Sequence, residues 1–180
     1  MTGWDLPSEL EVNGVPHPIN ADFRDILDIV SHLNADAVGV YVALALFYDD
    51  FDAIPEENYT DAIKVMFWFI NGGEEEKNTR PHPKTIDWEQ DRALIVADIN
   101  KVAGCEIRAL PFCHWWTFLA WFNGIGDGQL STVVSIREKL RRGKKLTEWE
   151  REFYRKNRDV VDFKTKYTEA EKAALTAWGV

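Results

Sequence analysis

The chain has 180 residues, of which 46% are hydrophobic and 13% aromatic, and its net charge is −9. This length predicts one domain, and the apolar content excludes an intrinsically disordered chain. Two cysteines, Cys105 and Cys113, are too few for a disulfide scaffold, so we expect a reducing compartment. The apolar run 37–48 contains a glycine and is shorter than the roughly 20 residues that cross a bilayer, so we expect no membrane partner.

The charge is divided unevenly along the chain. Residues 1–100 carry 20 acids and 6 bases, a net charge of −14, whereas residues 101–180 carry 10 acids and 15 bases, a net charge of +5. Such a chain repels a second copy side by side and attracts it head to tail. The pattern therefore predicts a homo-oligomer, although the same charges also serve solubility alone.

A hairpin is predicted at the start of the chain, followed by a helix. Asn13-Gly14 favours a type I′ turn because both residues take positive φ at low cost. Pro16 and Pro18 restrict the second strand to a sheet edge. Asn20 is the expected N-cap of a helix with a 3.6-residue apolar stripe, formed by Phe23, Ile26, Leu27, Val30 and Leu33.

Three more helices are predicted in the central part of the chain, over residues 36–48, 60–71 and 87–103. The second of them carries Ile63, Phe67 and Ile70 on one face. The third begins at Asp87 with a sequence that resembles a capping box. Between these two helices, residues 72–84 are polar and contain two prolines, which predicts a surface loop or linker.

The run Cys-His-Trp-Trp-Thr-Phe-Leu-Ala-Trp-Phe at 113–122 holds three of the eight tryptophans. It predicts a short helix from His114 to Asn123, with His114 as a core histidine or an N-cap. Its helical period places Trp116 and Trp121 away from the face that we expect in the core, which is formed by Trp115, Phe118, Leu119 and Phe122. We therefore expect Trp116 or Trp121 at a helix–helix seam or a partner surface.

The character of the chain changes near Gly143. A helix over 130–142 precedes this glycine, and capping boxes at 147–150 and 168–171 open two charged helices after it. We expect a helical body at 1–143 and a charged helical arm at 144–180, within one folding unit. The predicted fold class is all-α, a compact multi-helix domain with the one N-terminal β-hairpin.

The segment 137–166 carries 12 bases and 6 acids, with aromatic residues between them. Basic residues with aromatic neighbours can bind nucleic acid. Acids alternate with the bases here, however, which favours a solvated helix or a protein-docking arm. Together with Trp116 and Trp121, the candidate partner-binding residues are Arg137, Arg141, Arg142, Lys144, Lys145 and Trp149.

No pattern in the sequence predicts catalysis, a metal site or a cofactor. The histidines are scattered and pair with no nucleophile, and Cys105, Cys113 and His114 lack the spacing of a zinc site. Asp87 and Asp91 share a helix face and could bind a cation or act in acid–base chemistry. The alternatives are a cap and a solvated face, or an Asp91 that holds a buried arginine. We therefore expect a protein that is not an enzyme.

The order of several short motifs resembles a phage family. The motifs are Trp4-Asp5-Leu6-Pro7, Ile19-Asn20-Ala21-Asp22-Phe23-Arg24, Phe47-Tyr48, Phe69-Ile70, Asp87-Trp88-Glu89-Gln90-Asp91, His114-Trp115-Trp116-Thr117-Phe118 and Val134-Ser135-Ile136-Arg137. In this order they resemble the Gp15-type bacteriophage family, which is encoded beside the tape-measure gene of siphophages.

This resemblance implies a tail assembly chaperone, which coats the tape-measure protein in the host cytoplasm and is absent from the mature virion. The implied partner is the tape-measure protein, with the tail-tube protein as a second candidate. A long apolar helical rod needs such cover, and head-to-tail contacts between copies can generate an open helix around it. Two alternatives stay open: a structural tail or head–tail component that remains in the virion, and a small nucleic-acid-binding regulator.

Overall fold

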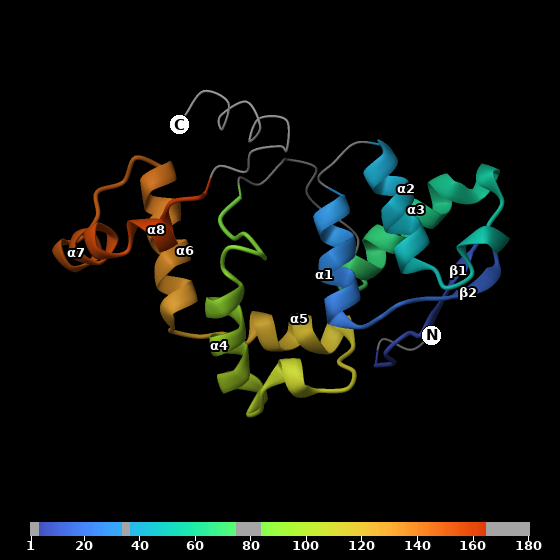
Figure 1. Ribbon diagram of the computed structural model, residues 1–180, viewed down its shortest axis with the longest axis horizontal. Helices are drawn as coiled ribbons and strands as arrows, with labels where there is room; N and C mark the ends of the chain where they lie inside the picture. The colour runs from blue at the N-terminus through green and yellow to red at the C-terminus, as the bar shows by residue number, and fades with distance from the viewer. Residues whose placement is uncertain (1–3, 34–36, 75–83, 165–180) are drawn as a thin grey trace, which may run out of the picture. The chain divides into compact units, whose positions relative to one another are not determined.

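The computed structural model describes residues 4–33, 37–74 and 84–164. It is mostly helical with a two-stranded antiparallel hairpin near the N-terminus, which confirms the predicted fold class. No helix within these described ranges is long and apolar enough to cross a membrane. The elements, shown in Figure 1, are β1 (Glu9–Val12), β2 (Val15–Pro18), α1 (Phe23–His32), α2 (Ala37–Phe47), η1 (Phe51–Ala53), η2 (Glu56–Asn58), α3 (Tyr59–Ile70), α4 (Arg92–Ala103), η3 (Ile107–Ala109), α5 (Trp115–Asn123), α6 (Gln129–Arg141), α7 (Glu148–Lys156) and α8 (Arg158–Val161).

The hairpin has the predicted turn. Asn13 has a φ of 50° and Gly14 a φ of 82°, and Val12 pairs with Val15 across the turn. Two successive positive φ angles are the signature of a type I′ turn. Along β1, Leu10 and Val12 are buried, whereas Glu9 and Glu11 are exposed. This alternation arises because successive residues of a strand point to opposite faces.

Helix α1 begins two residues later than a cap at Asn20 would place it. Its N-cap is Asp22, whose carboxylate accepts a hydrogen bond from the Arg24 backbone N–H at 3.0 Å. Asn20 instead donates its side-chain amide to the Leu46 carbonyl at 2.9 Å. The predicted cap at Asn20 is therefore wrong, because Asn20 makes a long-range contact to the end of α2.

Helix α3 buries a different face from the one with Ile63, Phe67 and Ile70. Its buried residues are Ala62, Met66 and Phe69, whereas the Phe67 side chain is 41% exposed. The Tyr48 hydroxyl donates to the Ala62 carbonyl at 3.0 Å and so anchors the buried face to the end of α2. Because α3 is apolar on both of these faces, periodicity alone could not decide between them.

Helix α4 begins at Arg92, five residues after the predicted start. The Asp87 carboxylate does accept hydrogen bonds from the Glu89 and Gln90 backbone N–H groups, but residues 88–91 form turns before the helix proper. The predicted capping box at the start of α7 is confirmed by reciprocal bonds between Thr147 and Glu150. The second predicted box, at 168–171, lies outside the described residues.

The chain divides into two compact units. Unit 1 comprises residues up to 82 together with 99–125, and unit 2 comprises 83–98 together with the chain from 126 onward, so the division falls within α4. The expected boundary at 143, between a body and an arm of one folding unit, stays a prediction. The start of the expected arm packs on α6. The apolar cluster of unit 2 is formed by Val133, Ile136 and Val161, with Leu94, Leu146, Phe153, Tyr154 and Val160 against it.

Candidate protein-binding surfaces

His114 is both a core histidine and the N-cap of α5. Its Nδ1 accepts a hydrogen bond from the Trp116 backbone N–H at 3.0 Å, which leaves Nε2 to donate to the Pro7 carbonyl at 3.0 Å. The ring is buried, and this burial lowers the pKa of His114, although the bond to Pro7 acts in the opposite direction. The imidazole is therefore held neutral as a structural group, as the sequence predicts for its position.

The expected core face of α5 is buried at its first turns. The Trp115 and Phe118 side chains are buried and stack on each other with ring centroids 5.4 Å apart, and Phe118 also stacks on Phe23 at 4.8 Å. The Trp115 indole donates to the Ile70 carbonyl at 2.8 Å. Leu119 and Phe122, on the same face, are partly buried. This face fixes α5 to α1 and to the end of α3.

Trp116 lies at the seam between α5 and α3. Its indole donates to the Phe69 carbonyl at 2.9 Å, its ring stacks on Phe69 at 5.5 Å, and Trp68 meets it edge to face at 5.6 Å. Trp116 is thus placed by contacts within unit 1, which is one of the two positions expected for it. Trp121 is partly buried, and its role at a partner surface stays a prediction.

An open groove of about 510 Å³ runs along the outward side of α3. Its apolar lining includes Ile63 and Phe67 of the stripe that the fold leaves out of the core, and Phe67 is an exposed large apolar residue. Glu74 and Lys64, which also pairs with Asp61, give the groove one anionic and one cationic group. The residues that line it are Ile63, Lys64, Val65, Phe67, Trp68, Asn71 and Glu74.

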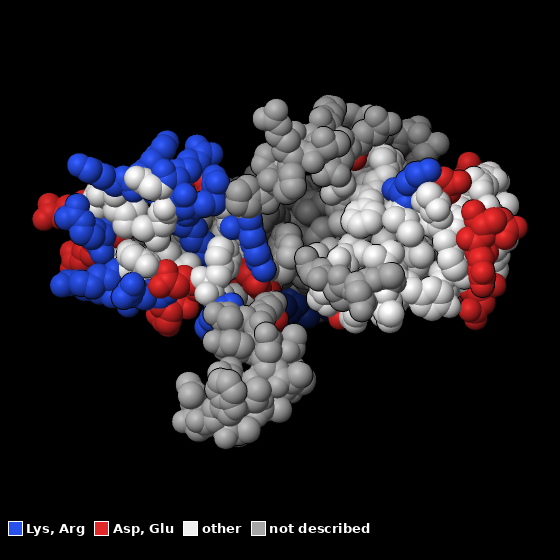
Figure 2. Space-filling model, turned by 90° about the horizontal axis from the view of Figure 1, so that it is seen from above, with Lys and Arg blue, Asp and Glu red and all other residues white. Residues whose placement is uncertain are grey.

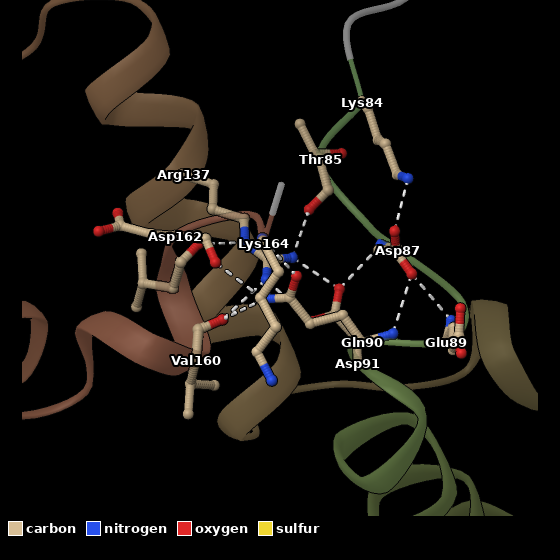
Figure 3. Close-up of polar contacts among 11 residues, drawn as sticks. Lys84, Thr85, Asp87, Glu89, Gln90, Asp91, Arg137, Val160, Asp162 and Lys164 are labelled. Carbon is tan, nitrogen blue, oxygen red and sulfur yellow. Dashed lines mark hydrogen bonds and ion pairs between the residues drawn. The ribbon is translucent and has the colours of Figure 1, made fainter. Parts of the chain in front are cut away.

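Arg137, a candidate partner-binding residue, is buried inside unit 2 (Figure 3). Its guanidinium makes a bidentate ion pair with Asp91, with distances of 2.6 and 2.8 Å, and donates to the carbonyls of Thr85, Val160 and Val161. The Phe163 ring lies 4.2 Å from the guanidinium carbon. All of these contacts are internal, so the Arg137 side chain is not presented to a partner.

The structure shows which of the roles suggested for Asp87 and Asp91 these residues have. Asp91 holds the buried arginine, and Asp87 is the local cap, which also receives the Lys84 ammonium (Figure 3). Burial acts to raise the pKa of Asp87, but the bonds from Lys84 and the backbone N–H groups outweigh it and hold the pKa well below its usual range. Gln90 completes the arrangement, because its side chain bonds to the Val160 and Asp162 carbonyls and to the Lys164 N–H.

The other basic candidates lie on the surface of unit 2. Figure 2 shows lysine and arginine side chains gathered over the part of the chain that contains α6 to α8. Arg141 and Arg142 are exposed but share one carboxylate, that of Glu138. Lys144 and Lys145 are exposed and have no carboxylate partner among the described residues. Trp149 is 61% exposed, and its ring lies tilted against that of Phe153, with ring centroids 5.6 Å apart.

Two arginines that the sequence did not single out complete this surface. Arg151 and Arg155, four residues apart and therefore on one face of α7, line an open groove of about 590 Å³ with Arg158. Neither has a carboxylate partner in the described part of the chain. The i, i+4 spacing could have identified them, but the interleaved glutamates obscured it. Glu148, Glu152 and Tyr154 form the rest of the lining.

A metal site and a reactive thiol were the other chemical groups considered in the sequence. Within residues 4–33, 37–74 and 84–164, no three histidine, cysteine, aspartate or glutamate side chains gather where they could hold a metal ion. Cys113 is buried, and burial raises the pKa of its thiol. A thiol with a raised pKa is a poor nucleophile at neutral pH. What the arrangement offers is contact area: an apolar groove on unit 1 and a basic, aromatic surface on unit 2.

The comparisons with known proteins give one match. A family model described as Bacteriophage Gp15 protein matches residues 4–163 of the chain. No curated protein and no solved structure matches this chain.

Proposed function

Because this chain belongs to the bacteriophage Gp15 protein family, and so is a phage protein, we propose that it acts as a tail assembly chaperone. In this role it binds the tape-measure protein in the host cytoplasm, promotes assembly of the tail tube and is absent from the mature virion. The work is non-enzymatic and consists of covering an apolar helical rod until tube subunits replace the cover. Copies of the chain associate with one another along the rod.

The α3 groove is the observation that carries this proposal. Helix α3 is apolar on two faces, of which one forms the core of unit 1 and the other lines the groove with an exposed Phe67. An amphipathic helix docks in such a groove through apolar residues at i, i+3, i+4 and i+7. The flanking Lys64 and Glu74 provide the polar rim that surrounds the apolar centre of a protein interface.

The test is co-expression of the chain with the tape-measure protein of its phage. We expect the two to co-purify and the tape-measure protein to stay soluble. Phe67→Glu should abolish both effects, because it places a carboxylate in the apolar centre of the contact. Phe112→Glu is the matched control, since Phe112 is also an exposed phenylalanine of unit 1, at 57%, but lies outside the groove. Equal loss in both variants, or none in either, would refute the α3 groove as the binding site.

The two alternatives are separated by two further measurements. Mass spectrometry of purified virions should find no copies of the chain, and stoichiometric copies would favour a structural tail or head–tail component. The exposed lysine and arginine side chains of unit 2 are the observation that favours a nucleic-acid-binding regulator as an alternative. A DNA mobility shift that persists at about 0.15 M salt and is lost in Lys144→Glu/Lys145→Glu would favour that role.

A further inference from the structure

The two units carry opposite charge. Among the described residues, unit 1 has 14 acids and 4 bases, whereas unit 2 has 11 acids and 13 bases. Four bases of unit 2 are exposed and have no carboxylate partner among the described residues: Lys144, Lys145, Arg151 and Arg155. We call these four residues the basic surface.

The acids of unit 1 gather on one part of it. Glu9 and Glu11 point outward from β1, and the Asn13 side chain bonds to the Asn58 side chain at 2.6 Å, which ties the hairpin turn to η2. Red side chains cluster over this end of unit 1 in Figure 2. The exposed acids here are Glu9, Glu11, Asp49, Asp52, Glu56 and Glu57, and none has a lysine or arginine partner in the described part of the chain. We call these six residues the acidic surface.

We propose that the basic surface of one copy binds the acidic surface of a second copy. Charge complementarity identifies the occupant: each surface carries several unpaired charges of one sign, and the chain itself supplies the opposite surface in equal number. The contact joins two different surfaces, so it is heterologous, and each bound pair leaves one surface of each kind free to continue the assembly. This inference gives residues to the self-association proposed with the chaperone function, but it concerns the chain alone and needs no tape-measure protein.

Charge cannot hold the contact without apolar help. Exposed ion pairs are individually weak, and at about 0.15 M salt their range is only about 8 Å. On the basic side, the Tyr154 ring lines the same groove as Arg151 and Arg155. On the acidic side, the exposed Val15 at the hairpin turn supplies an apolar group. Aromatic anchors of this kind carry much of the affinity of protein interfaces, while the charges set orientation and rate.

Sedimentation velocity of the purified full chain is the first test. We expect oligomers that grow with protein concentration at about 0.05 M salt and shift toward monomer at about 0.5 M salt. A wild-type chain that is monomeric at high concentration and low salt overturns the proposal, whatever the outcome of the co-expression with the tape-measure protein.

The sharper test is a pair of charge-reversed variants. One carries Lys144→Glu, Lys145→Glu, Arg151→Glu and Arg155→Glu, and the other carries Glu9→Lys, Glu11→Lys, Glu56→Lys and Glu57→Lys. Each should be monomeric alone, because both of its surfaces then have the same sign. A 1:1 mixture should associate again, because the intact basic surface of the second variant meets the intact acidic surface of the first. The two reversed surfaces are also opposite in sign, so they can form the same contact. Variants that are folded by circular dichroism but do not associate on mixing contradict the assigned surfaces.

A matched control separates this contact from a general effect of charge. Arg151→Glu/Arg155→Glu and Lys101→Glu/Arg108→Glu change the net charge equally, and all four residues are exposed. The first pair should raise the apparent dissociation constant by roughly tenfold or more, since like charges then oppose each other in the contact. The second pair, on unit 1 and outside the acidic surface, should leave it near the wild-type value. Equal weakening by both pairs also overturns the assignment.

Discussion

Arg137 and Asp91 are the most deeply buried ion pair among the described residues, with side chains that are 4% and 1% exposed. They lie 46 residues apart in the sequence, and the guanidinium also reaches three backbone carbonyls. The pair therefore joins the segment before α4, helix α6 and the end of α8 into unit 2 (Figure 3). Because every donor of this guanidinium points to an internal acceptor, the pair acts as the polar centre of the unit.

Removal of this guanidinium should destabilise unit 2 severely. Arg137→Met leaves Asp91 buried without a counter-charge, and we expect a loss of roughly 3–5 kcal/mol of unfolding free energy. Urea unfolding followed by circular dichroism measures it. Arg141→Met is the control, because that arginine pairs with Glu138 at the surface and should cost no more than about 1 kcal/mol. An Arg137→Met chain as stable as Arg141→Met would show that the guanidinium is not needed in the interior.

The double variant Asp91→Leu/Arg137→Met tests what else the guanidinium does. An ion pair replaced by apolar residues is often neutral in energy. Here the carbonyls of Thr85, Val160 and Val161 would still lose their donor. We therefore expect only partial recovery relative to Arg137→Met, measured in the same urea titration. Full recovery would mean that these carbonyls find other donors, such as water.

Phe118 should behave as a core residue of unit 1. Its side chain is 1% exposed and stacks between Phe23 and Trp115, so Phe118→Ala removes a large buried ring. We expect a loss of roughly 3–5 kcal/mol in unfolding free energy. Phe112→Ala, at an exposed phenylalanine, should stay within about 0.5 kcal/mol of the wild type. Thermal unfolding compares the two, and equal melting temperatures would contradict the core position of Phe118.

The sequence predicts the structure correctly where a feature depends only on neighbouring residues. The turn at Asn13-Gly14 and the cap at His114 depend on a few neighbouring residues, and both are formed as predicted. The face of α3 was not predictable in this way, because both of its stripes are apolar and a contact from Tyr48 selects one of them. A choice of that kind depends on the tertiary fold.

Pairing of charges was the least predictable property. The sequence suggested that Asp91 could hold a buried arginine, but nothing in it identified Arg137, which was expected on a partner surface instead. Similarly, the sequence does not distinguish Arg141 and Arg142, which form ion pairs with Glu138, from the unpaired Lys144 and Lys145. Net charge along a sequence gives the sign of a surface, whereas which charges are free depends on distances in the fold.

Gly73 should tolerate no side chain, for two separable reasons. Its φ of 82° is costly for any residue with a Cβ, and an added Cβ would lie 2.9 Å from Cη2 of Trp116. Gly104 also has a positive φ, of 69°, but open space around its Cβ position. Gly104→Ala should therefore cost about 1–2 kcal/mol from the backbone alone. Gly73→Ala should cost more, and thermal unfolding with tryptophan fluorescence measures both. Equal losses of unfolding free energy in the two variants would show that the Trp116 ring moves aside at no cost in stability.

His114 should make unit 1 sensitive to mild acid. Burial lowers the pKa of this histidine below its ordinary value of 6.5. The unfolded chain then binds the proton more readily, so protonation favours unfolding, and the stability falls as the pH drops below about 6.5. His114→Asn keeps a side-chain oxygen at the N-cap but loses the ring contacts with Phe69 and Trp116. It should therefore be less stable than the wild type at pH 8, and the difference should narrow between pH 7 and pH 5. Urea unfolding of both proteins at each pH measures this difference. A difference that is constant over this range would mean that His114 is protonated as readily in the folded chain as in the unfolded one.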